Sequence, residues 1–441
     1  MRFSIGRSRS TPEAQQLLPF AARARRLDLG FRRGIIAATV LVVLATVGGT
    51  RVGRYTAVSL ASRARLAAPR LIGLEPPREQ IDALWNVKRE RSMEQARAAL
   101  TRFMRGTTPE LRTLFDLTGM DPAHGLIRWG RGDLTFLLSS KVFEADDHGR
   151  SFRLRPNTRS VWLRQITMRD GPFSLLMVPD TPEIRESAKA AGGIVDLGSI
   201  TTTNSWGCRG PEPDLDASMR GIVLGDSFMQ GMFVGDDDAP PLRLQHELAK
   251  ARGVSVSILN TGHISYSPEQ YYYSLLEFGD RFRPRFVVVS VCPNDFGDEW
   301  EVLAGRGDDW DEADYWLGQI VLWCRGRNLP CVLVPVPCEP QIRGSRKDGF
   351  YPGRVCNLFQ GGSTSYCDPL DMFINEHLTL VREARRRGQS VGRSPLFNGR
   401  ISDGHFSANG AELWGQIVAR RVALLISSDR EAGRGVKAAR P

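Results

Sequence analysis

The chain has 441 residues, of which 41% are hydrophobic and 24% charged, a composition typical of a globular protein with two or three domains. Its net charge of +10 is unevenly placed. Residues 1–70 hold thirteen arginines and two acids, a charge of +11, which leaves the other 371 residues at about −1. A nearly neutral body gives no support to a nucleic-acid-binding function, because such domains concentrate basic residues on their surface.

A segment without charges lies inside the basic arm. Residues 34–50, GIIAATVLVVLATVGGT, are 17 uncharged residues between Arg33 and Arg51. This length is at the short end for a membrane helix, and flanking arginines fit a buried soluble helix poorly. We interpret 1–33 as a basic tail and 34–50 as a transmembrane segment or signal anchor, leaving open whether it is cleaved. The excess of arginine before it predicts a single-pass protein with an exported, periplasmic or extracellular body.

The next segments differ in their periodicity. Residues 51–130 are interpreted as a juxtamembrane and helical region, because 75–118 has apolar residues at helical spacing. Residues 131–210 contain short runs of β-forming residues separated by Gly, Pro, Asn and Asp, which predicts a β-rich accessory module. At the other end of the chain, 429–441 is interpreted as a disordered tail.

Between 218 and 428 the pattern alternates between strand and helix. Continuous apolar runs predict strands at 221–225, 254–260, 285–291 and 331–336, and helical patterns occur at 239–252, 268–280, 312–327, 371–388 and 408–426. Apolar runs that do not alternate are typical of parallel strands covered on both faces. We therefore predict an α/β domain with a doubly wound parallel sheet, whose ligand site lies beyond the carboxyl ends of the strands.

Polar residues follow three of these strands and precede the last helix. The first strand leads into GDS with Ser227, the second into NTG with Gly262, and the third into PND with Asn294. The sequence DGH, with Asp403 and His405, stands before the final helix. Each motif alone has a plain structural interpretation; Ser227, for example, could be a helix N-cap. Together they supply every group that acyl transfer requires.

The chemistry assigns one role to each residue. Ser227 is the candidate nucleophile, His405 the base that takes its proton, and Asp403 the carboxylate that orients the imidazole. The backbone N–H groups of Ser227 and Gly262 and the side-chain amide of Asn294 are the candidate oxyanion donors. This chemistry needs no cofactor, and no cysteine–histidine spacing indicates a metal site.

These four blocks resemble, in the same order, the signature segments of the SGNH (GDSL) hydrolase superfamily, over about 210 residues from 218 to 428. NSWGCRGPE, residues 204–212, resembles a lead-in found in bacterial members with amino-terminal extensions. The chain departs from the usual pattern at two places. It has Cys-Pro-Asn-Asp where Gly-x-Asn-Asp is common, and Asp-x-His instead of Asp-x-x-His, a spacing shared by relatives of polysaccharide O-acetylation proteins.

The resemblance implies a flavodoxin-like fold and a serine esterase that removes an acyl group, with an acylated carbohydrate or another small ester as substrate. A second hypothesis is an O-acyltransferase that passes the acyl group to an extracytoplasmic polysaccharide, because the catalytic residues are shared. A third is a non-catalytic glycan-binding scaffold, for which a degraded site would be the sign. Protein partners are not indicated.

All seven cysteines fall after residue 207. An exported body could place six of them in disulfides, with Cys356 and Cys367 the first pair to consider because they bracket a Gly/Ser-rich loop. The acidic clusters at 235–238 and 307–316 are interpreted as favourable charges at helix N-termini rather than as a calcium site.

Overall fold

The computed structural model describes residues 108–120, 126–129, 135–146, 151–164, 176–296, 310–344, 351, 355, 364–398 and 404–438. All of them belong to one compact unit, Lys88–Pro441. The predicted segment 34–50 lies outside the described residues, as do 1–33 and Asp403. Within the described ranges, no helix has the length and apolar character needed to cross a membrane.

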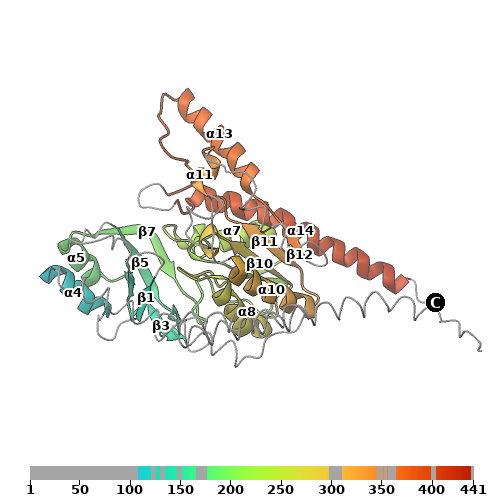
Figure 1. The fold of residues 1–441 in the computed structure, drawn as a ribbon, viewed down its shortest axis with the longest axis horizontal. Coiled ribbons are helices and arrows are strands. Elements are labelled where there is room, and N and C mark those ends of the chain that lie inside the picture. Colours follow the sequence, from blue (N-terminus) through green and yellow to red (C-terminus); the bar gives the residue numbers. More distant parts are fainter. Residues whose placement is uncertain are drawn as a thin grey trace, which may run out of the picture. The chain divides into compact units, whose positions relative to one another are not determined.

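A five-stranded parallel sheet forms the centre of the fold (Figure 1). Its strands are β8 (Met219–Leu224), β9 (Val256–Asn260), β10 (Phe286–Val291), β11 (Cys331–Pro335) and β12 (Thr364–Tyr366). Their spatial order, β12-β11-β10-β8-β9, is the flavodoxin-like order, in which the winding direction reverses between β8 and β10. The predicted doubly wound parallel sheet is therefore confirmed.

Helices cover both faces of this sheet (Figure 1). The longer ones are α7 (Pro240–Arg252), α8 (Pro268–Phe282), α10 (Trp310–Gly326), α13 (Leu370–Arg386) and α14 (Ala408–Ala438); α6 (Ser227–Gln230), α11 (Glu339–Ile342) and the 3₁₀ turns η1 (Asp236–Asp238) and η2 (Pro293–Asp295) are short. Helix α7 packs with α14, and α8 packs with α10. Along β10, Phe286 and Val288 join one apolar cluster, and the alternate residues Val287 and Val289 are equally buried. Since successive side chains of a strand point to opposite faces, both faces of β10 are covered.

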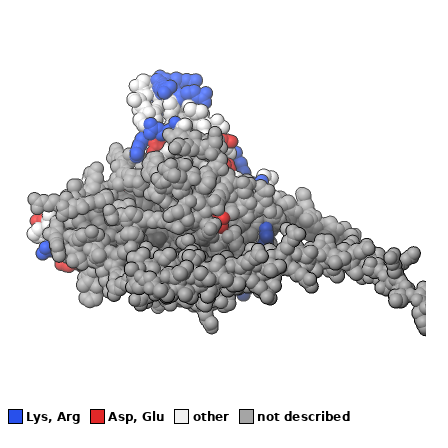
Figure 2. Space-filling view, viewed as in Figure 1, with Lys and Arg blue, Asp and Glu red and all other residues white. Residues whose placement is uncertain are grey.

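The C-terminal helix corrects one expectation. Helix α14 continues to Ala438, so most of 429–441, predicted to be a disordered tail, is helical. The reason is that extending a helix costs far less than starting one, and Glu431, Ala432 and Lys437 favour it in spite of two glycines. Basic side chains also gather at the exposed end of α13, where Arg385 and Arg386 stand in the last turn (Figure 2). Positive charge there complements the negative end of the helix dipole.

A second group of strands precedes the parallel sheet. It consists of α4 (Pro109–Thr118), β1 (Leu126–Trp129), β2 (Thr135–Leu138), β3 (Phe143–Asp146), β4 (Ser151–Leu154), β5 (Arg159–Arg164), β6 (Leu176–Pro179), α5 (Pro182–Ala190) and β7 (Ile194–Thr202). Strand β5 is central in an antiparallel sheet of order β6-β5-β7, while β1–β2 and β3–β4 form two hairpin-like pairs. Leu114, Val161 and Val178 are fully buried in its separate small core. We call residues 109–202 the accessory module.

The cysteines do not follow the disulfide expectation within the part of the chain that is described. The six that fall there, at 208, 292, 324, 331, 338 and 367, are buried thiols and not halves of disulfides. Cys324 and Cys331 lie side by side; their hydrogen bond, together with burial, holds the pKa of Cys324 well above its usual range. Cys356 lies outside the described residues, but its predicted partner Cys367 is one of these thiols, so the structure does not contain the predicted Cys356–Cys367 pair.

Candidate active site

The turn after β8 places Ser227 at the start of a short helix. Asp226 is the N-cap of α6, and its Oδ1 accepts a hydrogen bond from the Phe228 N–H at 3.0 Å. Ser227 is therefore the first helical residue and not the cap, which removes the plain structural explanation for its hydroxyl. Gly225 is required for this turn, because a Cβ there would lie 2.4 Å from the Met229 side chain.

The Ser227 hydroxyl contacts a histidine that is far from it in the sequence. Its Oγ lies 2.8 Å from Nε2 of His405, although 178 residues separate the two in sequence. The histidine follows Gly404, which has a φ of +59°, and precedes Phe406, which forms an isolated β-bridge with Phe397. The structure thus brings together two of the predicted catalytic residues at hydrogen-bonding distance.

Asn398 fixes the histidine loop. Its backbone N–H donates to the His405 carbonyl at 2.7 Å, and its side-chain Nδ2 donates to the carbonyls of Phe406 and Phe233. One asparagine therefore joins the histidine loop to the segment that follows the nucleophile helix. Its role was not visible in the sequence, because it depends on a chain crossing between residues 165 positions apart.

The His405 imidazole is enclosed by aromatic rings. Phe228 stacks on it with ring centroids 4.6 Å apart, and Phe233 meets it edge-on at 6.0 Å. Only 8% of the residue is exposed, and this burial lowers its pKa from 6.5 to about 4. The imidazole is therefore neutral at physiological pH, as a general base must be. Its Nδ1 is buried and has no hydrogen-bond partner among the described residues, and Asp403 is not one of them.

Asn294 reaches the site from the neighbouring strand. It lies in η2, directly after β10, and its Nδ2 donates to Asp226 Oδ2 at 3.2 Å. Since β8 and β10 are adjacent, Ser227 and Asn294 both stand at the point where the strand order reverses. The amide nitrogen of Asn294 carries a second hydrogen that is available to an oxyanion.

Two buried acids support this arrangement. Burial raises the pKa of Asp226, and it raises the pKa of Asp295 well above its usual range, with the nearby Asp226 charge adding to the effect. Asp295 accepts hydrogen bonds from the Cys292 N–H at 2.8 Å and from the Tyr271 hydroxyl at 2.9 Å. These contacts hold η2, and with it Asn294, against the end of the sheet.

Gly262 lies where the loop after β9 meets helix α6, and its role as an oxyanion donor stays a prediction. Its N–H donates to Asn260 Oδ1 at 2.9 Å. A Cβ at this glycine would lie 2.5 Å from Met229 Cβ and 2.6 Å from the Gln230 backbone nitrogen. Gly262 therefore lets the loop after β9 pack directly on helix α6.

Ser265, in the same loop, has an unusual backbone conformation that the sequence did not reveal. Its φ of 60° is unusual for a residue with a side chain, and such strain is concentrated at functional sites. The loop is held on both sides, since the Ile264 N–H donates to Gln230 Oε1 at 2.6 Å and the Tyr266 N–H to the His263 carbonyl. Among the described residues the Ser265 N–H has no hydrogen-bond acceptor.

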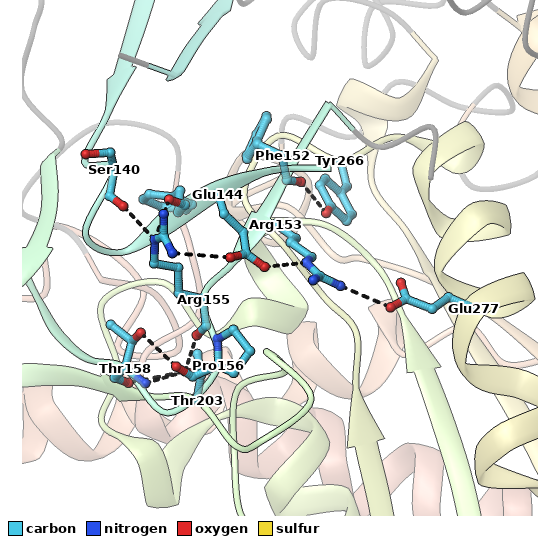
Figure 3. A network of polar contacts seen from close by, with 11 residues as sticks. Ser140, Glu144, Phe152, Arg153, Arg155, Pro156, Thr158, Thr203, Tyr266 and Glu277 are labelled. Atoms are coloured by element: carbon cyan, nitrogen blue, oxygen red, sulfur yellow. Dashed lines mark hydrogen bonds and ion pairs between the residues drawn. The ribbon is translucent and has the colours of Figure 1, made fainter. Parts of the chain in front are cut away.

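The accessory module is tied to this loop (Figure 3). The Tyr266 hydroxyl donates to the Phe152 carbonyl of β4 at 2.6 Å. Arg153 of the same strand pairs with Glu144 at 2.7 Å and with Glu277 of α8 at 3.1 Å. Polar contacts therefore join the module to the loop after β9 and to helix α8.

No protein-family model matches the chain, and no curated protein matches its sequence. Solved structures that are similar include an acetyl xylan esterase at 15% identity, covering 46% of this chain and 100% of that one, with a TM-score of 0.35. An acetylxylan esterase from Geobacillus stearothermophilus has 16% identity over 47% and 94% of the two chains, with a TM-score of 0.35. A lipolytic protein of the G-D-S-L family from Desulfitobacterium hafniense DCB-2 has 13% identity over 46% and 99%, with a TM-score of 0.26. Because these TM-scores are all below 0.5, the similarities carry no argument about function.

Proposed function

We propose that the protein is a serine ester hydrolase of the SGNH (GDSL) type that removes an acyl group from a carbohydrate. The observation that carries the proposal is the 2.8 Å contact between Ser227 Oγ and His405 Nε2 at the end of a parallel sheet. The ordered sequence blocks around both residues support the same conclusion. A glycan-binding scaffold would not require a serine hydroxyl held against a buried, neutral imidazole.

In the first half of the reaction, Ser227 Oγ attacks the acyl carbon while its proton passes to His405 Nε2. The negative charge that develops on the carbonyl oxygen is stabilised by N–H donors, for which Ser227, Gly262 and the Asn294 amide are the candidates. The imidazolium then returns its proton to the departing alcohol oxygen. The carbon–oxygen bond breaks, and the acyl group is left on Ser227 as an ester.

In the second half, water takes the place of the alcohol. His405 Nε2 removes a proton from the water as it attacks the acyl carbon, and the Ser227 oxygen leaves with the proton that the imidazolium returns. Asp403 is proposed as the acceptor for the Nδ1 hydrogen of His405, since it stands two residues earlier and Nδ1 is otherwise buried. Such an acceptor fixes the tautomer in which Nε2 carries the free lone pair.

The carbohydrate substrate and the location of the protein rest on the sequence. The Asp-x-His spacing of the final block is shared by relatives of polysaccharide O-acetylation proteins, and segment 34–50 predicts membrane anchoring of an exported body. Acetylxylan is the natural first substrate to test, because it is the substrate named for two of the similar structures.

The test is an assay of the full chain, purified in detergent, with p-nitrophenyl acetate and with acetylated xylo-oligosaccharides. Release of acetate that depends on Ser227 is the expected result. The acyltransferase hypothesis predicts instead that a polysaccharide acceptor accelerates p-nitrophenol release and becomes acetylated. If neither substrate is cleaved and an active-site-directed phosphonate fails to label Ser227, the hydrolase proposal is wrong.

A further inference from the structure

Arg209 is buried in the loop between the accessory module and the parallel sheet. It belongs to the lead-in segment 204–212, its side chain is fully enclosed, and it forms a β-bridge with Thr203. Asn204 shapes this loop, since its Oδ1 accepts from the backbone N–H groups of Trp206 and Cys208. The sequence of the lead-in therefore folds into a support for one buried guanidinium group.

The guanidinium binds the segment that directly follows the nucleophile helix. Its Nη1 donates to the carbonyls of Gln230 at 2.7 Å and Gly231 at 2.5 Å, and its Nη2 donates to Val234 at 2.7 Å. Its Nε donates to the carboxylate of Asp236 at 3.1 Å. We call residues 230–236 the clamped loop. A final hydrogen bond, from Nη2 to the Ile200 carbonyl at 3.1 Å, ties the loop to strand β7 of the module.

The clamped loop cannot hold this shape without a partner for its carbonyls. Gly231 and Phe233 both have positive φ values, of 78° and 66°, and this backbone costs free energy at Phe233. Several carbonyl oxygens converge on one point, where they repel each other unless a cation lies between them. A Cβ at Gly231 would lie 2.8 Å from Nη1 of Arg209, so the glycine lets the guanidinium approach.

This loop touches both members of the Ser227–His405 pair. The Met232 N–H donates to the Ser227 carbonyl at 3.1 Å, and the Phe233 ring closes one side of the His405 imidazole. Trp162 of the accessory module packs against Phe233, with ring centroids 5.5 Å apart. The position of Phe233 therefore controls how far His405 is shielded from water.

We propose that Arg209 is a positioning residue, which holds the clamped loop so that Phe233 keeps His405 desolvated and aligned with Ser227. The loop between the accessory module and the parallel sheet thus completes the site through one buried arginine, without supplying a group that touches the substrate. The effect on turnover rests on the proposed hydrolase function. The effect on His405 does not, because the ionisation of an imidazole can be measured without any substrate.

The experiment compares Arg209→Met, Arg209→Lys and Asp236→Asn with the wild type and with Asp237→Asn. Asp237 is the matched control, since it is exposed, adjacent in sequence and outside the contacts of Arg209. Each variant is first checked for folding by circular dichroism. The His405 pKa is then measured by NMR on histidine-labelled protein, with the resonance assigned from His405→Ala, and kcat and KM are measured with p-nitrophenyl acetate.

Arg209→Met removes every donor, and we expect its kcat to fall by about 100-fold at nearly unchanged KM, the usual effect of a misplacement near 1 Å. The His405 pKa should rise toward 6.5 as water reaches the ring. Arg209→Lys keeps the charge but not the fork of donors, so both effects should be smaller. Asp236→Asn should show the smallest effects, and Asp237→Asn none.

A His405 pKa that stays at the wild-type value in folded Arg209→Met or Arg209→Lys overturns the proposal, whatever happens to kcat. A merely structural role predicts that outcome, with a lower melting temperature alone. If Arg209→Met does not fold, the His405 pKa is compared in Arg209→Lys and Asp236→Asn, and a pKa at the wild-type value in both overturns the proposal. If the wild type has no esterase activity, the hydrolase proposal fails, and the NMR comparison still decides the role of Arg209.

Discussion

Replacing Ser227 by alanine separates catalysis from stability at this site. The substitution removes one hydroxyl, whose described side-chain contact is the 2.8 Å hydrogen bond with His405 Nε2. The helix cap is unaffected, because Asp226 supplies it. A neutral hydrogen bond contributes about 0.5–1.5 kcal/mol to stability, and an unsatisfied buried nitrogen costs about 1–3 kcal/mol. The loss of stability should therefore not exceed about 3 kcal/mol.

The loss of activity should be far larger. Removing the nucleophile of a serine hydrolase lowers kcat on the order of a million-fold, which corresponds to about 8 kcal/mol of transition-state stabilisation. The assay is the hydrolysis of p-nitrophenyl acetate, with the melting temperature of the same samples followed by circular dichroism. For a domain of this size, about 1 kcal/mol shifts the melting temperature by roughly 2–4 °C.

Ser290→Ala is the matched control. Ser290 is a buried serine on β10, and its Oγ has no hydrogen-bond partner among the described residues. It should retain activity within a few-fold of the wild type. If Ser227→Ala hydrolyses the ester within tenfold of the wild-type rate, the assignment of Ser227 as nucleophile is refuted, however much its melting temperature has changed.

Four other outcomes are expected. Because the pKa of His405 is lowered, the acid limb of kcat/KM should fall below pH 6.5, between that value and about 4; a limb above pH 6.5 would contradict the buried neutral base. Asn294→Ala should lower kcat by roughly 100- to 1,000-fold in the same assay, the scale of one oxyanion donor. Asp403→Asn should reduce kcat and move the acid limb to still lower pH, because a negative neighbour that favours the imidazolium is lost. Deletion of 1–70 should move the protein from the membrane pellet to the soluble fraction, and an uncleaved full chain found entirely in the soluble fraction would contradict the anchor.

The sheet was predictable where its strands carry a strong local signal. Strands β8, β9, β10 and β11 lie in stretches rich in apolar residues, and the structure places them within a few residues of their predicted positions. Strand β12 was missed because Thr364–Tyr366 is only three residues long and has no apolar run. Its place in the sheet comes from pairing with β11, which is a long-range contact that no local pattern records.

The catalytic pair of the site could be predicted from the sequence, but the hydrogen bonds around it could not. Ser227 and His405 follow from the ordered motifs and the rule that parallel strands end at one edge. The hydrogen bond from the Gly262 N–H to the Asn260 side chain could not be predicted, because a sequence motif does not specify a side-chain rotamer. The role of Arg209 could not be predicted for a related reason. Four of the hydrogen bonds of its guanidinium go to backbone carbonyl oxygens between 9 and 25 residues away, and every residue of a chain has such an oxygen.

The surroundings of His405 explain why a carboxylate is needed behind it. The rings of Phe228 and Phe233 keep the imidazole neutral, but the same desolvation makes it a weaker base. A base whose pKa is near 4 accepts a serine proton poorly, since proton transfer is most effective when the base has a pKa near the working pH. A negative charge next to Nδ1 would stabilise the imidazolium that forms during attack and raise the pKa again. Aromatic enclosure and the proposed Asp403 contact therefore act in opposite directions on one imidazole, and their balance sets the pH range in which the site can work.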